Sequence, residues 1–166
     1  MRDEASVARL IGEDRPFQEA YWSFQRVAWF SFAALVAFAL AGGMGGEGPL
    51  ARQSLTSGSA VIDAPRVMRW EANDEIRIRE ATSPRESIAV VLSPALTDTL
   101  QIETISPTPF QTATTRAGTS YWFFLEPRTR ADITFHIRAI RPRVHLDGMI
   151  QVGDGRPTLL SLTVLP

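Results

Sequence analysis

The sequence predicts a mainly β protein, an antiparallel immunoglobulin-like β-sandwich preceded by one transmembrane α-helix. One uncharged apolar stretch near the N-terminus has the length of a membrane span. Beyond it, the hydrophobic period changes to two, as in half-buried strands. Turn-forming residues then recur about every ten positions, which is typical of about seven to nine short strands in a sandwich, and a small barrel fits the same pattern.

Length and composition exclude several classes of protein. The chain has 166 residues and a net charge of −1, whereas a nucleic-acid-binding protein normally carries a basic excess. There is no cysteine, so disulfides, thiolate metal sites and a cysteine nucleophile are excluded. The length leaves room for one ordinary domain with accessory segments.

Residues 1–26 are predicted to form a helical, cytoplasmic N-terminal arm. Apolar residues between Val7 and Ile11 recur at helical spacing, and Asp14 can cap a second helix that has Pro16 in its first turn. This second helix is expected to continue into the membrane. The arm can lie on the bilayer surface or against a partner.

Residues 27–46 are predicted to be the transmembrane helix. No charge occurs between Arg26 and Glu47, and about 20 residues at about 1.5 Å each span the hydrocarbon core of about 30 Å. Aromatic residues that suit a membrane interface cluster at its start, namely Tyr21, Trp22, Phe24 and Trp29. The alternatives are a buried helix of a soluble protein and a signal peptide cleaved after Ala39 or Ala41.

Arginines flanking the helix predict its orientation. Arg9, Arg15 and Arg26 precede it, whereas Arg52 alone lies close after it. The positive-inside rule places the N-terminus in the cytoplasm and the C-terminal domain in the periplasm or outside the cell. The chain is therefore expected in a bacterial inner membrane as a single-pass protein.

Small residues within the span predict contact with another helix. Ala33, Ala37 and Ala41 recur every fourth position, so they fall on one narrow helix face, and small residues on one face allow membrane helices to approach closely. The simpler interpretation is an alanine-rich helix that ends in glycines.

Residues 47–58 are predicted to be a flexible linker, because Pro49 stops a helix and polar residues follow. The β-sandwich is expected over residues 59–166. Its strands are predicted from alternating segments and apolar runs, at Ile76–Ile78, Ile88–Leu92, Leu100–Ile105, Tyr121–Leu125, Ile133–Ala139 and Leu160–Val164.

The glycine-rich exit with Gly48-Pro49-Leu50, followed by a β-rich domain ending in Leu162–Pro166, resembles a group of uncharacterised bacterial single-pass membrane proteins with an outer immunoglobulin-like sandwich. That resemblance implies the topology and the fold, and transfers no catalytic residue. The arrangement also resembles the copper-delivering assembly factor of cytochrome oxidase. That family needs paired cysteines, which this chain lacks.

No residue pattern predicts an enzyme, a metal site or a cofactor. His and Met are copper ligands, and His145 and Met149 would share one face of a continuous strand. Asp147-Gly148 between them favours a turn instead. Neither the acidic residues nor His136 form a recognisable acid–base or calcium-binding pattern.

Two features predict binding. Tyr121–Leu125 is apolar on both faces, so either Trp122 with Phe124, or Tyr121 with Phe123 and Leu125, is left for a partner. The arginines that include Arg138, Arg141 and Arg143 suit lipid headgroups or an acidic partner, or form a solvated strand face.

These observations predict a non-enzymatic accessory or assembly subunit of a membrane protein complex. Its partner-binding residues are expected to be Ala33, Ala37, Ala41, Trp122, Phe124, Arg138, Arg141 and Arg143. The partners are integral membrane proteins and the lipid bilayer, with no nucleic acid. The alternative is a membrane-anchored sensory or carrier domain for a small molecule or metal, which requires a concave pocket.

Overall fold

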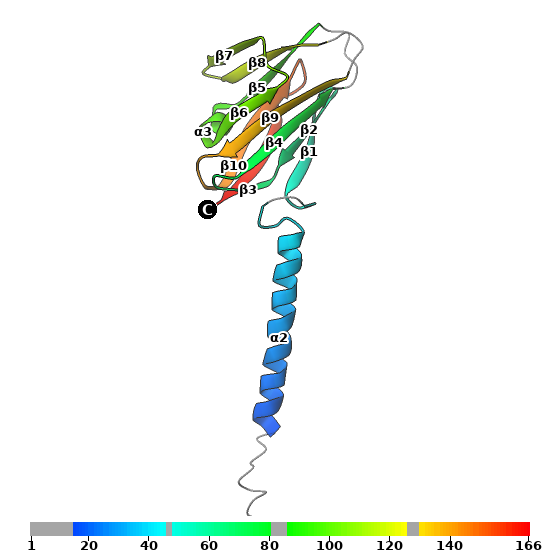
Figure 1. Cartoon of the computed structure of the whole chain (residues 1–166), viewed down its shortest axis with the longest axis vertical. Coiled ribbons are helices and arrows are strands. Elements are labelled where there is room, and N and C mark those ends of the chain that lie inside the picture. The colour runs from blue at the N-terminus through cyan, green and yellow to red at the C-terminus, as the bar shows by residue number, and fades with distance from the viewer. Residues whose placement is uncertain (1–14, 46–47, 81–85, 126–129) are drawn as a thin grey trace, which may run out of the picture. The chain divides into compact units, whose positions relative to one another are not determined.

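A computed structural model describes residues 15–45, 48–80, 86–125 and 130–166 (Figure 1). The chain forms two compact units, Met1–Phe38 and Ala39–Pro166. Each unit is described by itself below.

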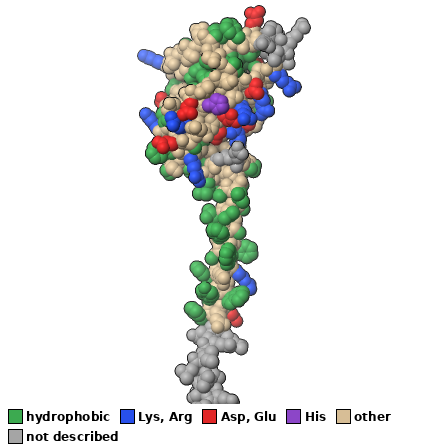
Figure 2. Space-filling view, in the orientation of Figure 1, with side chains coloured by type: hydrophobic (Ala, Val, Ile, Leu, Met, Phe, Trp, Pro, Cys, Tyr) green, Lys and Arg blue, Asp and Glu red, His purple; other side chains and the backbone are tan. Residues whose placement is uncertain are grey.

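The first unit contains all but the last two residues of helix α2 (Arg15–Leu40), which is long and apolar enough to cross a membrane over Phe17–Leu40. Figure 2 shows hydrophobic side chains along most of its surface and few charged ones. The expected second helix of the arm and the expected span are one continuous helix. The predicted helical spacing between Val7 and Ile11 lies outside the described residues.

Helix α2 ends six residues before the predicted boundary at Gly46, which corrects the span of 27–46. Residues 41–45 form turns, in which the Gly42 N–H donates to the Ala39 carbonyl at 3.0 Å. Gly42 has a φ of 89°, a left-handed conformation that glycine adopts without a Cβ penalty and that commonly ends helices. Ala41 is therefore in a turn and does not extend the helix face of Ala33 and Ala37.

The second unit is a β-sandwich of two sheets, as predicted. Sheet A has the strand order β1 (Arg52–Ser57), β2 (Ala60–Pro65), β4 (Asn73–Glu80), β9 (Ala131–Ala139) and β6 (Leu100–Ser106). Sheet B has the order β3 (Val67–Arg69), β11 (Thr158–Leu165), β10 (Arg143–Val152), β5 (Ser87–Leu92), β8 (Gly118–Phe124) and β7 (Gln111–Thr115). Only the pairing of β3 with β11 is parallel among these neighbours. Helix α3 (Pro94–Thr99) connects β5 to β6.

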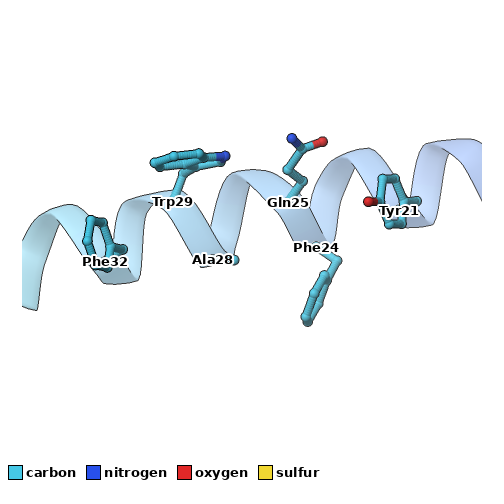
Figure 3. A pocket seen from close by; sticks show the side chains of 6 residues that line it. All are labelled: Tyr21, Phe24, Gln25, Ala28, Trp29 and Phe32. Carbon is cyan, nitrogen blue, oxygen red and sulfur yellow. The ribbon is translucent and has the colours of Figure 1, made fainter.

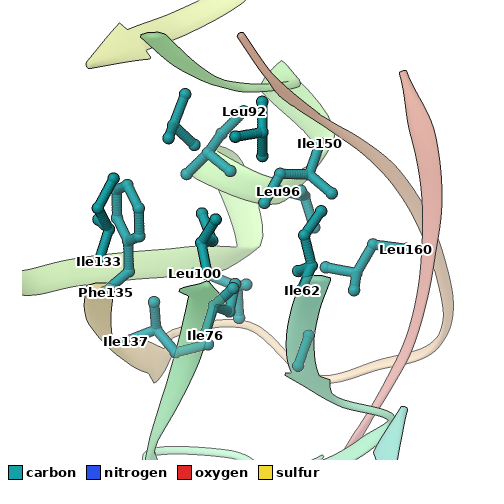
Figure 4. Packing of buried hydrophobic residues seen from close by; sticks show 14 of the residues in the cluster. Ile62, Ile76, Leu92, Leu96, Leu100, Ile133, Phe135, Ile137, Ile150 and Leu160 are labelled. Atoms are coloured by element: carbon teal, nitrogen blue, oxygen red, sulfur yellow. The ribbon is translucent and has the colours of Figure 1, made fainter. Parts of the chain in front are cut away.

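The core lies between the sheets and confirms the predicted alternation. The inward positions of β4, β9 and β11 are fully buried, at Ile76, Ile78, Ile133, Phe135, Ile137, Ala139, Leu160, Leu162 and Val164. Figure 4 shows part of this core, in which Ile76, Ile137 and other labelled side chains of sheet A meet Ile150 and Leu160 of sheet B. Phe123 of sheet B lies edge-on to Phe135 of sheet A, with ring centroids 6.1 Å apart. Aromatic packing thus joins the two layers.

Strand β1 lies inside the stretch predicted to be a linker, so the prediction for residues 47–58 is wrong from Arg52 onward. β1 pairs with β2 in register, with Leu55 opposite Ile62. Leu55 also packs against the core. One apolar residue in a polar segment gives no alternation, so the pairing partner rather than the local pattern makes this segment a strand.

The predicted turn at Asp147-Gly148 is also wrong, because both residues lie within β10. Gly148 faces the core, where a Cβ would lie 2.3 Å from Cγ of Leu96 in α3. The glycine is therefore needed for the close approach of α3, not for a turn.

Candidate interaction surfaces

The outer face of sheet B is free of charge over most of its width. Strands β5, β7, β8 and β11 contain no Asp, Glu, Arg, Lys or His residue. We call this surface the uncharged face. We define it by the following outward residues of these strands, of the second half of β10 and of the segment just before β7: Ala89, Val91, Phe110, Ala113, Ser120, Trp122, Phe124, Met149, Gln151, Leu159 and Ser161. Asp147 and His145, earlier on β10, lie at its border.

Strand β8 presents Trp122 and Phe124 on the uncharged face, while Tyr121 and Phe123 are buried in the core. This resolves the alternative that the sequence left open for the aromatic run. Phe124 is 71% exposed and stacks on Phe110, with ring centroids 4.0 Å apart. Phe110 was not recognised from the sequence, because it lies in a Pro-rich turn and reaches Phe124 only through the β7–β8 hairpin.

The apolar character continues onto the neighbouring strands. Met149 on β10 lies opposite Leu159 on β11, and both side chains are more than half exposed, at 54% and 58%. Val91 on β5 lies between Gln151 on β10 and Ser120 on β8, whereas Ala89 lies opposite Trp122, so Met149 and Leu159 lie further along the strands than Trp122. Exposed apolar side chains at separate positions of one uncharged sheet face are unusual on a surface that contacts only water.

The outer face of sheet A is instead highly charged. Its central strands β4 and β9 place Glu75 opposite His136 and Arg79 opposite Asp132. Arg77 forms an ion pair with Glu75 on the same strand. Figure 2 shows acidic and basic side chains side by side across the face of the sandwich turned toward the viewer. Opposite charges on neighbouring strands stabilise a sheet in contact with water.

Arg52 joins three strands of sheet A. Its Nε donates to Asp63 at 3.0 Å, and its Nη1 donates to Asp74 at 2.9 Å. Its Nη2 also donates to the Glu75 carbonyl. Partial burial lowers the pKa of Arg52, but the hydrogen bonds and charges of the two aspartates raise this pKa by more, so the guanidinium stays charged.

The arginines predicted to bind a partner lie in different places. Arg138 is on sheet A, where its Nε is 2.9 Å from a carboxylate oxygen of Glu103. Arg141 and Arg143 are exposed in and after the β9–β10 loop. None of the three belongs to the uncharged face with Trp122 and Phe124, so the predicted set does not form one site.

Helix α2 carries the remaining predicted residues and one further feature. Ala33 and Ala37 are exposed on it. A shallow groove runs along the helix between aromatic side chains and is lined by Tyr21, Phe24, Gln25, Ala28, Trp29 and Phe32 (Figure 3). Sequence reasoning assigned Tyr21, Phe24 and Trp29 to the membrane interface and did not recognise that they line a groove together with Phe32.

The histidines lie apart from one another. Nε2 of His145 is 3.2 Å from a carboxylate oxygen of Asp147 on the uncharged face's border, whereas His136 is on the outer face of sheet A. With β10 continuous, His145 and Met149 do share one strand face. Within the described ranges, no group of three or more His, Cys, Asp or Glu side chains is placed to hold a metal ion.

The structure thus defines a mainly β protein with a two-sheet β-sandwich and an apolar N-terminal helix. No protein-family model matches the chain, and no curated protein matches it in sequence. Among solved structures, the chain is similar to the cohesin module from Clostridium perfringens ATCC13124 family 33 glycoside hydrolase. That similarity has a TM-score of 0.43 with 12% sequence identity, and covers 67% of this chain and 98% of the module.

Proposed function

We propose that this protein is a non-enzymatic accessory or assembly subunit of a membrane protein complex, with α2 as its membrane anchor and the uncharged face as its partner-binding surface. The observation that carries the proposal is the absence of charge on strands β5, β7, β8 and β11, combined with the exposure of Phe124, Met149 and Leu159. Depletion of charge with enrichment of aromatic residues and Met is typical of the centre of a protein interface.

The anchor supports a partner in the membrane. Helix α2 is apolar around its circumference from Val27 to Leu40, and its side chains are exposed. Ala33 and Ala37 provide a narrow face where a second helix can approach closely. In this proposal the N-terminus is cytoplasmic, and the sandwich lies in the periplasm or outside the cell.

Co-purification tests the proposal. The tagged full-length protein is extracted from its native membrane with a mild detergent, and stoichiometric partners are identified by mass spectrometry. Phe124→Asp places a charge on the uncharged face, at an exposed aromatic residue, and is expected to remove the partner. Thr104→Asp, on an exposed position of β6 in sheet A, is the matched control and should retain it.

Two outcomes contradict the proposal. If the protein is extracted as a monomer without a stoichiometric partner, it is not a subunit of a stable complex. If a partner is lost equally with Phe124→Asp and Thr104→Asp, the uncharged face is not the binding surface. An additional variant, Ala37→Leu, tests the helix face, because a bulky side chain there prevents close helix approach.

A further inference from the structure

We propose that the end of the sandwich next to the helix exit is a lipid-binding surface that rests on the headgroups of the membrane. This inference rests on the proposed membrane anchor. It concerns a surface of the second unit that is distinct from the uncharged face. Its residues are Met44, Leu50, Arg66, Arg69, Trp70 and Arg141, which we call the exit surface.

Hydrogen bonds tie the chain just after α2 to this end of the sandwich. The Leu50 N–H donates to the Ala41 carbonyl at 3.0 Å, and Nε of Arg69 donates to the Met44 carbonyl at 3.1 Å. Further along, the Arg66 N–H donates to the carbonyl of Ala51, which is fully buried. The described residues 41–45 and 48–51 are therefore held to the folded domain by these hydrogen bonds.

Chain connectivity then sets where this end lies. A spanning helix that ends at Leu40 brings Ala41 to the lipid surface, because turns are not stable in contact with the hydrocarbon core. Counting back about 20 residues from Leu40 starts the span at Tyr21, which places Tyr21 and Trp22 at the opposite interface. Arg26 then lies about 7 Å inside that boundary, within reach of the headgroups through its long side chain.

The exit surface has the composition of a membrane interface. Met44, Leu50 and Trp70 are 40%, 45% and 49% exposed. Trp70 is held by the β3–β4 turn, where its N–H donates to the Leu165 carbonyl at 2.7 Å. Tryptophan with its amphipathic ring is enriched at headgroup depth.

The charges at this end favour anionic lipid. Among the described residues at this end, Arg66, Arg69, Arg141 and Arg143 are exposed, as are the acids Glu71 and Asp98. The β9–β10 loop joins this end because the Glu71 N–H donates to the Ala139 carbonyl at 2.8 Å. Arg52 adds no free charge, since Asp63 and Asp74 neutralise it. Exposed arginines near a bilayer bind lipid phosphates through charge and hydrogen bonds.

Tryptophan quenching tests the inference on the full chain. Three variants each keep one tryptophan, Trp29, Trp70 or Trp122, with the other three replaced by phenylalanine. They are reconstituted in nanodiscs of phosphatidylcholine and phosphatidylglycerol, with or without bromine on the upper acyl chain. Brominated lipid is expected to quench Trp29 and Trp70 and to leave Trp122 unchanged. Thermal unfolding of each variant verifies that the sandwich is folded.

The three tryptophans separate the two proposals. If Trp29 is quenched while Trp70 behaves like Trp122, the anchor is supported and the lipid-binding surface is overturned, which assigns this end to a protein neighbour or to water. If Trp29 is not quenched, the membrane anchor itself is wrong and the inference fails with it.

The arginines are tested in the variant that keeps Trp70. Arg66→Gln together with Arg141→Gln is expected to reduce the quenching of Trp70, and Arg77→Gln together with Arg79→Gln, on the outer face of sheet A, is expected to leave it unchanged. Equal quenching in both double variants would overturn the contact between these arginines and the headgroups.

Discussion

The outer face of sheet A carries acids and bases on adjacent strands, whereas most of the outer face of sheet B carries no charge at all. The inner faces of both sheets are mostly apolar and buried, with Glu80 at the end of β4 and Thr119 on β8 among the buried polar residues. Burial in the core therefore explains why the inner faces are apolar, but it does not explain why the two outer faces differ in charge. A face made for water uses paired charges, and a face that is left without charges on a folded domain is suited to a partner.

The largest expected effect is on the inner side of strand β8. Phe123→Ala removes a fully buried ring that packs on Phe135, and should lower the free energy of unfolding by about 3–5 kcal/mol. Chemical denaturation of the full chain in detergent measures this loss. A loss below about 1 kcal/mol would contradict the burial of Phe123 in the shared core.

A smaller loss is expected where α3 closes the sandwich over β10. Gly148→Ala forces a methyl group against Leu96 and should cost about 1–3 kcal/mol through overpacking. The double variant Gly148→Ala with Leu96→Ala relieves this clash, so its loss should be less than the sum of the two single losses. Strict additivity of the two losses would show that Gly148 and Leu96 are not in contact.

Breaking an ion pair on sheet A is expected to lower the free energy of unfolding more where the pair is partly buried than where it is exposed. Arg52→Met breaks the partly buried pairs with Asp63 and Asp74 and should cost about 1–2 kcal/mol, between the values for exposed and buried pairs. Arg77→Met breaks the pair with Glu75, in which the arginine side chain is 52% exposed, and should cost about 0.5 kcal/mol or less. Equal losses in thermal or chemical unfolding would show that Arg52 does not join the strands of sheet A.

The smallest effect on stability is expected on the uncharged face. Phe124→Ser removes an exposed ring whose packing partner is Phe110, so the free energy of unfolding should fall by about 1 kcal/mol or less. Binding of the co-purified partner should nevertheless weaken strongly, as at an interface hot spot. A variant that unfolds as readily as Phe123→Ala would show that Phe124 serves the fold rather than a partner.

The local pattern was sufficient where burial repeats with a short period. The alternation in Ile133–Ala139 and in Leu160–Val164 predicted strands whose inward residues the structure buries. The uncharged stretch after Arg26 predicted an apolar helix near the correct place. In each case the residue types repeat on one face of a single helix or strand, so residues close in sequence are sufficient to predict that element.

The pattern failed where a distant group decides the structure. Polar residues 52–57 become strand β1 because β2 pairs with them and Asp74 binds Arg52. Gly148 stays in a strand because Leu96 occupies the space beside it. Although β2 follows β1 after a short turn, Asp74 is far in sequence from Arg52 and Leu96 is far from Gly148, so the local pattern does not identify these side-chain contacts.

The candidate surfaces divide in the same way. The sequence alone determined that Tyr121–Leu125 has more apolar residues than one buried face needs, and that arginines outnumber acids between Glu126 and Arg156. Only the tertiary structure decided that Trp122 and Phe124 face outward on the same sheet face as Met149 and Leu159, and that Arg138 belongs to another face. The composition of a strand is fixed along the chain, but a surface is formed by several strands whose order and register depend on packing of the whole domain.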